Sequence, residues 1–304
     1  MSTPFSQNTI KNTGSIHGVG VHGGCLVNMV VHPAPLNTGI VFRVAGKKRV
    51  EIKASWQNVT STHYSTVLSH EGVSISTVEH VLAALWSQGL SNLFIEIDGP
   101  EVPILDGSAQ VWMDFFTSLG REPQSSRMPA LTVHKACWVR HQESWLHIAP
   151  SQELRIDMFT SLDDGTMHAF SYRHCDREES FLRHIAGART FSFHKHIEAM
   201  RERGLIKGGS LDNALVLHEG KALNALGLRY DNECARHKIL DFIGDWALSG
   251  ARFCGHITGF NSGHTLNHRL LTTVLQASTT EGRVRTSKKW SVRPMPLECA
   301  APPL

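Results

Sequence analysis

The chain contains the run His237-Lys238-Ile239-Leu240-Asp241-Phe242-Ile243-Gly244-Asp245, whose pattern predicts a helix with two distinct faces. At helical pitch His237, Asp241 and Asp245 are spaced i, i+4 and i+8, so they form one polar stripe. The apolar residues of the run form the neighbouring face, which should pack against a core. A histidine and a carboxylate four residues apart can hold one zinc ion. An isolated H-x-x-x-D pattern is more often a solvated polar face, so the stripe alone leaves both interpretations open.

The length and composition of the chain indicate a globular protein of one large or two ordinary domains. It has 304 residues, of which 41% are hydrophobic. Lysine and arginine number 30 against 27 aspartates and glutamates, so no strong field attracts nucleic acid or an anionic membrane. The 19 histidines are an unusually large number and favour metal or proton chemistry. We therefore expect no nucleic-acid partner.

The 6 cysteines lack C-x-x-C spacing, which argues against a disulfide framework and against a zinc site built from thiolates. No basic and apolar leader opens the chain, and no apolar run approaches the roughly 18 residues of a membrane span. We expect a cytoplasmic protein that acts as a monomer, while transient contact with a membrane surface stays an open alternative.

Residues 121–130 are predicted to be a linker because they are polar, contain two prolines and lack an apolar period. They divide the chain into a first domain at 1–122, a second domain at 130–285 and a tail at 286–304. Both halves contain strands and helices, which predicts an α+β fold of two similar modules. We expect strands at 26–31, 39–44, 93–97, 131–139, 144–148 and 155–159, and helices at 76–88, 109–119, 197–203, 232–249 and 270–275.

Glu79 and His80 lie near the start of the helix expected at 76–88. Ser76 and Glu79 have the S-x-x-E spacing of a capping box, in which Ser76 is the N-cap residue and Glu79 only completes the cap. The functional alternative makes His80 a metal ligand and Glu79 a base for water. A hydrolytic zinc site needs three protein ligands and an open position, so His80 would complete the set begun by the stripe in the second half.

His264 lies in the run Ser262-Gly263-His264-Thr265-Leu266-Asn267, a Gly-His turn that leads into an apolar helix. A histidine beside glycine can reach into a pocket, and its pKa suits a proton donor near neutral pH. Asp245, on the same stripe as the candidate ligands, could pair with it and hold it as an imidazolium. A surface loop histidine is the alternative, and His256, which also follows a glycine, is a competing candidate.

The run Ala188-Arg189-Thr190-Phe191-Ser192-Phe193 places a hydroxyl between a basic residue and two aromatic residues. As a strand it would present Phe191 and Phe193 on one face and Thr190 on the other, where Thr190 could donate to an oxyanion. Gly209 is a candidate for close approach to a ligand, although a Gly-Gly pair is usually only a turn. The chain has neither a G-x-G-x-x-G motif nor a P-loop, so no nucleotide cofactor is indicated.

Five runs occur in a defined order along the chain. They are Ser76-Thr77-Val78-Glu79-His80, Pro103-Ile104-Leu105-Asp106-Gly107-Ser108, Ala188-Arg189-Thr190-Phe191, Arg236-His237-Lys238-Ile239-Leu240-Asp241 with Gly244-Asp245, and Ser262-Gly263-His264-Thr265-Leu266-Asn267. Together they resemble the UDP-3-O-acyl-N-acetylglucosamine deacetylase family, the zinc amidases of lipid A synthesis in Gram-negative bacteria. The resemblance covers about residues 8–275, which is nearly everything except the tail.

The resemblance implies a zinc ion held by His80, His237 and Asp241, although these ligands also suit Fe(II). Glu79 would activate the attacking water, and His264 would protonate the leaving amine. The implied reaction hydrolyses the acetamide of UDP-3-O-(3-hydroxyacyl)-N-acetylglucosamine, so the expected partner is a UDP-linked acylated amino sugar.

The remaining residues of the implied site orient the acid or contact the substrate. Asp245 would orient His264, Thr190 would join zinc in stabilising the oxyanion, and Lys238 would contact the polar head of the substrate. The other expected substrate contacts are Phe191, Phe193 and Gly209.

The fold that the resemblance implies has two similar α+β domains, with helices sandwiched between two sheets and the site at the domain junction. An insert at about 193–210 would receive the acyl chain in an apolar passage, with Leu205 and Ile206 among the candidate lining residues. The chain departs from the family pattern at His63-Tyr64-Ser65 and at His194-Lys195-His196. These departures leave the ligands intact but could change the shape of the passage.

Two alternatives to this activity stay open. One is a zinc deacetylase that acts on a different acylated amino sugar, and the other is a non-catalytic, metal-stabilised binding protein of the same fold. A structural zinc site closes its fourth position and needs neither Glu79 nor His264, so the presence of both residues favours an enzyme.

Overall fold

The computed structural model of the chain describes residues 6–45, 50–174 and 178–280. The tail predicted at 286–304 lies outside the described residues. Within them, no helix combines the length and the apolar character needed to cross a membrane.

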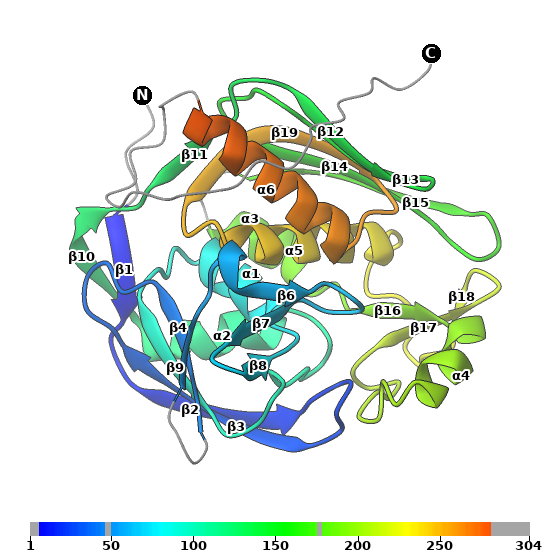
Figure 1. The fold of residues 1–304 in the computed structure, drawn as a ribbon. Helices are drawn as coiled ribbons and strands as arrows, with labels where there is room; N and C mark the ends of the chain where they lie inside the picture. Colours follow the sequence, from blue (N-terminus) through cyan, green and yellow to red (C-terminus); the bar gives the residue numbers. More distant parts are fainter. Residues whose placement is uncertain (1–5, 46–49, 175–177, 281–304) are drawn as a thin grey trace.

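Two β-sheets enclose a layer of helices (Figure 1). The main sheet of the first half lies at the bottom of the view, and that of the second half lies at the top. Between them pack α1 (Glu79–Ser87) from the first half and α5 (Glu233–Ala247) and α6 (His264–Thr280) from the second. The α+β sandwich expected from the sequence is therefore confirmed.

The first half is built on a mixed sheet with the strand order β2-β3-β9-β4-β5. Alternate residues of β3 face the core, so Val27, Met29 and Val31 are buried while Leu26 and Asn28 are exposed. The strands expected at the start of the chain are confirmed with small changes of bounds. The elements are β2 (Gly14–Val19), β3 (Leu26–Pro33), β4 (Ile40–Val44), β5 (Val50–Lys53), β9 (Leu93–Ile97) and α2 (Gln110–Leu119).

A small antiparallel sheet, β6-β7-β8, flanks this module. The loop between β6 and β7 reaches the second half of the chain, where the hydroxyls of Thr62 and Thr265 lie 2.8 Å apart. This loop therefore brings first-half residues to the domain junction. The elements are the 3-10 turn η1 (Trp56–Asn58), β6 (Val59–Ser61), β7 (Val67–His70) and β8 (Val73–Ile75).

Most of the segment predicted as a linker is a strand. Strand β10 (Arg121–Arg127) pairs antiparallel with β1 (Ser6–Ile10). The polar side chains are used in hydrogen bonds, since Gln124 accepts from Asn92 Nδ2 at 2.6 Å and donates to Ala34 O at 2.9 Å. The linker prediction is wrong for 121–127, because the polar side chains here form hydrogen bonds within the fold. The domain bounds themselves stay a prediction.

The second half is built on a sheet with the order β12-β13-β19-β14-β15, and β11 also pairs with β19. The single strand expected at 131–139 is wrong, because β11 runs parallel to β19 whereas β12 pairs with β13. The elements are β11 (Ala130–Thr132), β12 (Cys137–His141), β13 (Ser144–Ala149), β14 (Leu154–Ser161), β15 (Met167–Arg173), α3 (Glu178–Phe181), the π-helical turn η2 (Leu182–Ala186) and β19 (Arg252–Phe260).

A separate small sheet projects from the second half and lies at the right of Figure 1. In it β16 (Phe191–Phe193) runs parallel to β17 (Leu215–His218), which pairs with β18 (Lys221–Ala222). The helix α4 (His194–Glu202) follows β16 directly, so it begins three residues before the predicted start at 197. This unit contains the segment in which the sequence predicts the insert.

Helix α1 begins at Glu79, so the capping box predicted for Ser76 is wrong. Ser76 forms an isolated bridge with Glu101, and its hydroxyl donates to Pro100 O at 3.4 Å. Thr77 then turns the chain with a φ of 60°. Because the extended backbone at Ser76 precedes this turn, Glu79 does not complete a cap.

The other predicted helices are confirmed, with one change that affects the site. Helix α5 agrees with the expected range 232–249, and α2 agrees with 109–119. Helix α6 begins at His264 rather than at 270. His264 is therefore the first residue of a helix and not part of a loop.

A glycine controls how closely α1 and α5 approach. A Cβ atom built on Gly244 of α5 would lie 2.0 Å from the carbonyl oxygen of Glu79 and 3.0 Å from its Cα. Real Cβ contacts are not this short, so only glycine allows the two backbones to meet here. The side chains of Glu79 and His80 consequently face α5 across the domain junction.

Replacing Gly244 with Ala should separate the two helices. Alanine favours a helix by about 1 kcal/mol over glycine, but overpacking costs about 1–3 kcal/mol, so we expect a lower free energy of unfolding. Denaturant unfolding measures this change. Gly263→Ala is the control, because a Cβ there has no heavy atom within 4 Å. A Gly244→Ala variant as stable as the wild type would show that the crossing tolerates a side chain.

Candidate metal centre and active site

Three buried side chains of ligand type meet where α1 crosses α5. His80 comes from α1, and His237 and Asp241 lie one turn apart on α5, with their ligand atoms within 4.8 Å of one another. Asp241 Oδ1 lies 3.2 Å from His237 Nε2 and 3.7 Å from His80 Nε2. The imidazole centroids are 5.0 Å apart. The predicted meeting of the two halves at this point is present.

The arrangement of these atoms fits a bound divalent cation. His237 Nδ1 donates to Ala188 O at 3.0 Å, which leaves Nε2 as the unprotonated nitrogen directed at Asp241. Among the described residues, the buried Asp241 Oδ1 has no hydrogen-bond partner. A buried carboxylate oxygen with no donor, facing two imidazole nitrogens, is the environment that a zinc ion would satisfy.

Burial and neighbouring charges set the protonation of two of these groups in favour of metal binding. Burial lowers the pKa of His80 to about 3, helped by His237 and opposed by Asp241. Burial alone would raise the pKa of Asp241, but the neighbouring His237, His264 and Lys238 hold it well below its usual value. A neutral imidazole and an ionised carboxylate are the forms that bind a metal.

Glu79 lies beside this cluster and faces His264. Glu79 Oε1 is 3.7 Å from His264 Nε2, and Oε2 accepts a hydrogen bond from the backbone N–H of Thr66 at 3.1 Å. Burial raises the pKa of Glu79 to about 7, and the nearby Asp245 and Asp241 add to the rise while His264 opposes it. A carboxylate with this pKa can accept a proton near neutral pH.

His264 is held by a set of hydrogen bonds to Asp245. Its Nδ1 donates to Asp245 Oδ2 at 2.8 Å, and Asn267 Nδ2 donates to the same oxygen at 2.8 Å. Thr66 Oγ1 donates to Asp245 Oδ1 at 2.5 Å. Burial alone would lower the pKa of His264, but Asp245 and Glu79 raise it to about 10. The predicted contact between Asp245 and His264 is therefore present, and the imidazole is cationic at neutral pH.

The cluster opens into a cavity of about 610 Å³. Thr190, Phe191, Phe193 and Lys238 all line it. Lys238 Nζ lies 3.5 Å from Asp241 Oδ2 and 5.2 Å from the centre of the Phe191 ring, so it lies between the candidate metal ligands and β16. Other lining residues include Val21, His22, Tyr64, His141, Ser144, His196, Ala199, Met200, Arg203, Ile206, Ala214 and Asn261.

Some predicted residues lie elsewhere. Gly209 and Leu205 are not among the lining residues, and Gly209 instead packs on Ile206, whose carbonyl accepts from its N–H at 3.1 Å. The competing candidate His256 is part of the second-half sheet, where its Nε2 lies 2.5 Å from Asp157 Oδ2. This position does not support His256 as the proton donor, which the sequence left as an alternative.

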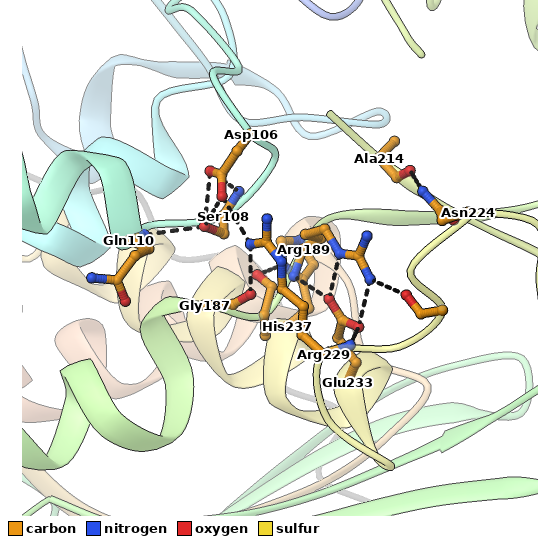
Figure 2. Close-up of polar contacts among 12 residues, drawn as sticks. Asp106, Ser108, Gln110, Gly187, Arg189, Ala214, Asn224, Arg229, Glu233 and His237 are labelled. Atoms are coloured by element: carbon orange, nitrogen blue, oxygen red, sulfur yellow. Dashed lines mark hydrogen bonds and ion pairs between the residues drawn. The ribbon is translucent and has the colours of Figure 1, made fainter. Parts of the chain in front are cut away.

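A buried ion pair supports the backbone next to the cluster. Figure 2 shows Arg189 facing Glu233, with Nε to Oε1 at 2.8 Å and Nη2 to Oε2 at 3.0 Å. The N–H of Arg189 also donates to Glu233 Oε1 at 3.0 Å. Because Arg189 lies between Ala188, whose carbonyl accepts from His237, and Thr190, this pair fixes the segment that leads into β16.

A second pair joins the halves beside it. Arg229 Nη1 donates to Asp106 Oδ2 and to Gly187 O, at 2.8 and 3.0 Å, and its backbone N–H donates to Glu233 (Figure 2). The Ser108 hydroxyl also donates to Asp106. The Asp106-Gly107-Ser108 run thus contacts the loop before α5 as well as introducing α2.

Sequence reasoning missed several residues that hold the site. Glu233 and Arg189 are 44 positions apart, so no local spacing links them. Thr66 is in a loop without a recognisable motif. Asn267 lies in the same run as His264, one helical turn after it. Its contact with Asp245 would be expected from this spacing if α6 were known to begin at His264.

Comparisons with known proteins identify relatives over most of the chain. Residues 7–276 match the family described as UDP-3-O-acyl N-acetylglycosamine deacetylase. A UDP-3-O-acyl-N-acetylglucosamine deacetylase of Thioalkalivibrio sulfidiphilus is 41% identical, over 88% of this chain and 90% of that protein. Proteins with the same description from Myxococcus xanthus and Syntrophotalea carbinolica are 39% and 38% identical, over 89% and 88% of this chain and 87% of each relative.

Replacing Arg189 with Met should destabilise the protein strongly. Glu233 is fully buried, and a buried charge that loses its partner costs about 3–5 kcal/mol of the free energy of unfolding. Arg173→Met is the control, since Arg173 and its partner Glu153 are about 60% exposed and 3.5 Å apart. That change should cost less than about 1 kcal/mol. Equal losses in denaturant unfolding would contradict a special role for the buried pair.

Proposed function

The chain belongs to the UDP-3-O-acyl N-acetylglycosamine deacetylase family, and on this premise we propose that it is a zinc-dependent amidohydrolase. It hydrolyses the acetamide of UDP-3-O-(3-hydroxyacyl)-N-acetylglucosamine to the free amine and acetate, the committed step of lipid A biosynthesis. The supporting observation is the buried cluster His80, His237 and Asp241, with Glu79 and His264 beside it on the wall of one cavity.

The cluster would hold zinc through His80, His237 and Asp241, and Fe(II) is an alternative that suits the same ligands. When bound, zinc would polarise the amide carbonyl and acidify the attacking water. The two nitrogen ligands and one carboxylate match the ligand type and number of hydrolytic zinc sites.

Glu79 acts as the general base. Its carboxylate accepts one proton from the water whose oxygen attacks the acetyl carbon. The hydrogen bond from the Thr66 N–H fixes one oxygen, so the other is directed toward His264 and the cavity. Its raised pKa of about 7 gives it the basicity that proton abstraction near neutral pH requires.

His264 acts as the general acid. As the C–N bond breaks, its Nε2–H is transferred to the amine nitrogen, because an unprotonated amine is a poor leaving group. Asp245 accepts from Nδ1, which keeps the ring oriented with Nε2 toward Glu79. Asp245 is a positioning residue in this scheme.

The other lining residues bind and orient the substrate. Thr190 precedes β16 at the cavity wall and would donate its hydroxyl to the oxyanion. Lys238 would contact the polar head, with Phe191 and Phe193 beside it. Gly209 would act only through the shape of the insert. Because the substrate is a nucleotide sugar, we place the reaction in the cytoplasm. The lipid A product implies a Gram-negative bacterium, and we propose that the protein acts as a monomer.

Acetate release from UDP-3-O-acyl-N-acetylglucosamine tests this proposal. The purified protein should release acetate, a chelator should abolish release, and added zinc should restore it. Glu79→Ala should abolish turnover while zinc content, measured by elemental analysis, persists, since Glu79 is not a ligand. Bound zinc without any acetate release would favour the non-catalytic binding protein. Release only from another acylated amino sugar would favour the other deacetylase.

The pH dependence of kcat/KM should be bell-shaped. Glu79 must be ionised, so the rate rises as pH passes its pKa of about 7. His264 must be protonated, so the rate falls as pH passes its pKa of about 10. A bound cation would move both limbs to lower pH without removing either. Asp245→Asn should move the alkaline limb to lower pH, because Asp245 contributes most to the raised pKa of His264. A flat profile over about pH 5–11 would contradict both assignments.

A further inference from the structure

Tyr64 has an unusual backbone in the loop between β6 and β7. Its φ is 64°, in the left-handed region that favours glycine and is unfavourable for a bulky residue. The side chain is 45% exposed and yet lines the cavity that contains the metal ligands. A strained and half-exposed aromatic residue at a cavity wall is placed there by a specific contact.

The contact is a hydrogen bond to the opposite wall. Arg203 Nη1 donates to the Tyr64 phenol oxygen at 2.8 Å. Arg203 directly follows α4 and also lines the cavity. Tyr64 belongs to the first half of the chain and Arg203 to the second, so the bond spans the cavity between the halves.

One face of α4 forms the wall that this bond reaches. His196, Met200 and Arg203 are spaced i, i+4 and i+7, and all three line the cavity. At 1.5 Å per residue this stripe extends roughly 10 Å from the β16 end of the helix. Ala199 and Ile206 add apolar surface along the same wall. This wall therefore combines the apolar surface of Ala199, Met200 and Ile206 with His196 and Arg203, and these five residues include no carboxylate, unlike the cluster at α5.

The wall is also anchored at its far end. The backbone N–H groups of Lys207 and Gly208 donate to His22 O and Val21 O at 3.2 and 3.1 Å. A Cβ on Gly208 would lie 2.3 Å from Gly20 O, so a glycine is needed for this approach. The main chain thus fixes the far end of the α4 wall to the segment at His22, whose ring centroid lies 6.4 Å from that of Tyr64.

We propose that Tyr64 and Arg203 form a bar across the passage that covers the substrate acyl chain and so selects for long chains. This inference rests on the proposed function, since that function supplies the acyl substrate. The phenol ring and the aliphatic stem of Arg203 present apolar surface to a chain lying along α4, while the hydrogen bond keeps the polar ends away from it. A short chain ends before the bar and gains nothing from it.

The test compares long-chain and short-chain substrates of the same head group. Tyr64→Phe keeps the ring but removes the hydrogen bond, and it should raise KM for the long-chain substrate about three- to tenfold, the size of one hydrogen bond. The value of kcat and the KM of the short-chain substrate should not change, because Glu79 and His264 are untouched. Arg203→Met should have the same effect, and the double variant should be no worse than either single variant. Arg201→Met is the matched control, since Arg201 is exposed on the same helix and does not line the cavity.

A binding measurement separates this inference from the proposed function. Calorimetry of the zinc-loaded protein with 3-hydroxytetradecanoate, and with 3-hydroxybutanoate as the short probe, needs no turnover. Weaker binding of the long probe alone in Tyr64→Phe supports the bar, even if no acetate is ever released. Equal changes for both probes, additive single effects, or the same effect in Arg201→Met would overturn it. Acetate release with unchanged chain selectivity in the variants would overturn the bar and leave the deacetylase intact.

Discussion

The close crossing of α1 and α5 is the constraint on which the site depends. Gly244 allows the backbone of α5 to meet that of Glu79, where a Cβ would approach to 2.0 Å. His80 follows Glu79 on α1 and is thereby brought to His237 and Asp241 on α5. Each half supplies too few ligands for a metal site, so the chemistry exists only when the two sheets close over the shared helix layer.

The charges of the side chains around this crossing favour a cationic ligand. The carboxylates of Glu79, Asp241 and Asp245 outnumber the nearby cations, His264 and Lys238. Buried negative charge without full compensation is costly, and part of that cost appears as the raised pKa of Glu79. A divalent cation would reverse the local excess, which makes the geometry and the electrostatics point to the same ligand.

The sequence predicts what depends on short-range periodicity. The helical spacing of His237 and Asp241 is sufficient to place them on one face of α5, and the order of the five runs predicts their partners. The sequence does not predict contacts between distant segments. Arg189 and Glu233 pair across 44 positions. Ser76 does not cap a helix because it forms a β-bridge with Glu101 instead. Where tertiary pairing competes with a local pattern, the local pattern predicts the wrong structure.

The start of α6 at His264 explains why a cationic imidazole at this position needs Asp245. The positive end of a helix dipole disfavours a cation in the first turn, and burial disfavours it further. A histidine in this place would therefore be neutral without compensation. Asp245 supplies the largest opposing effect, and Asn267, one turn into the same helix, fixes the carboxylate oxygen that His264 contacts. The stripe on α5 thus has two parts, because His237 and Asp241 face the candidate metal site and Asp245 raises the pKa of His264 on α6.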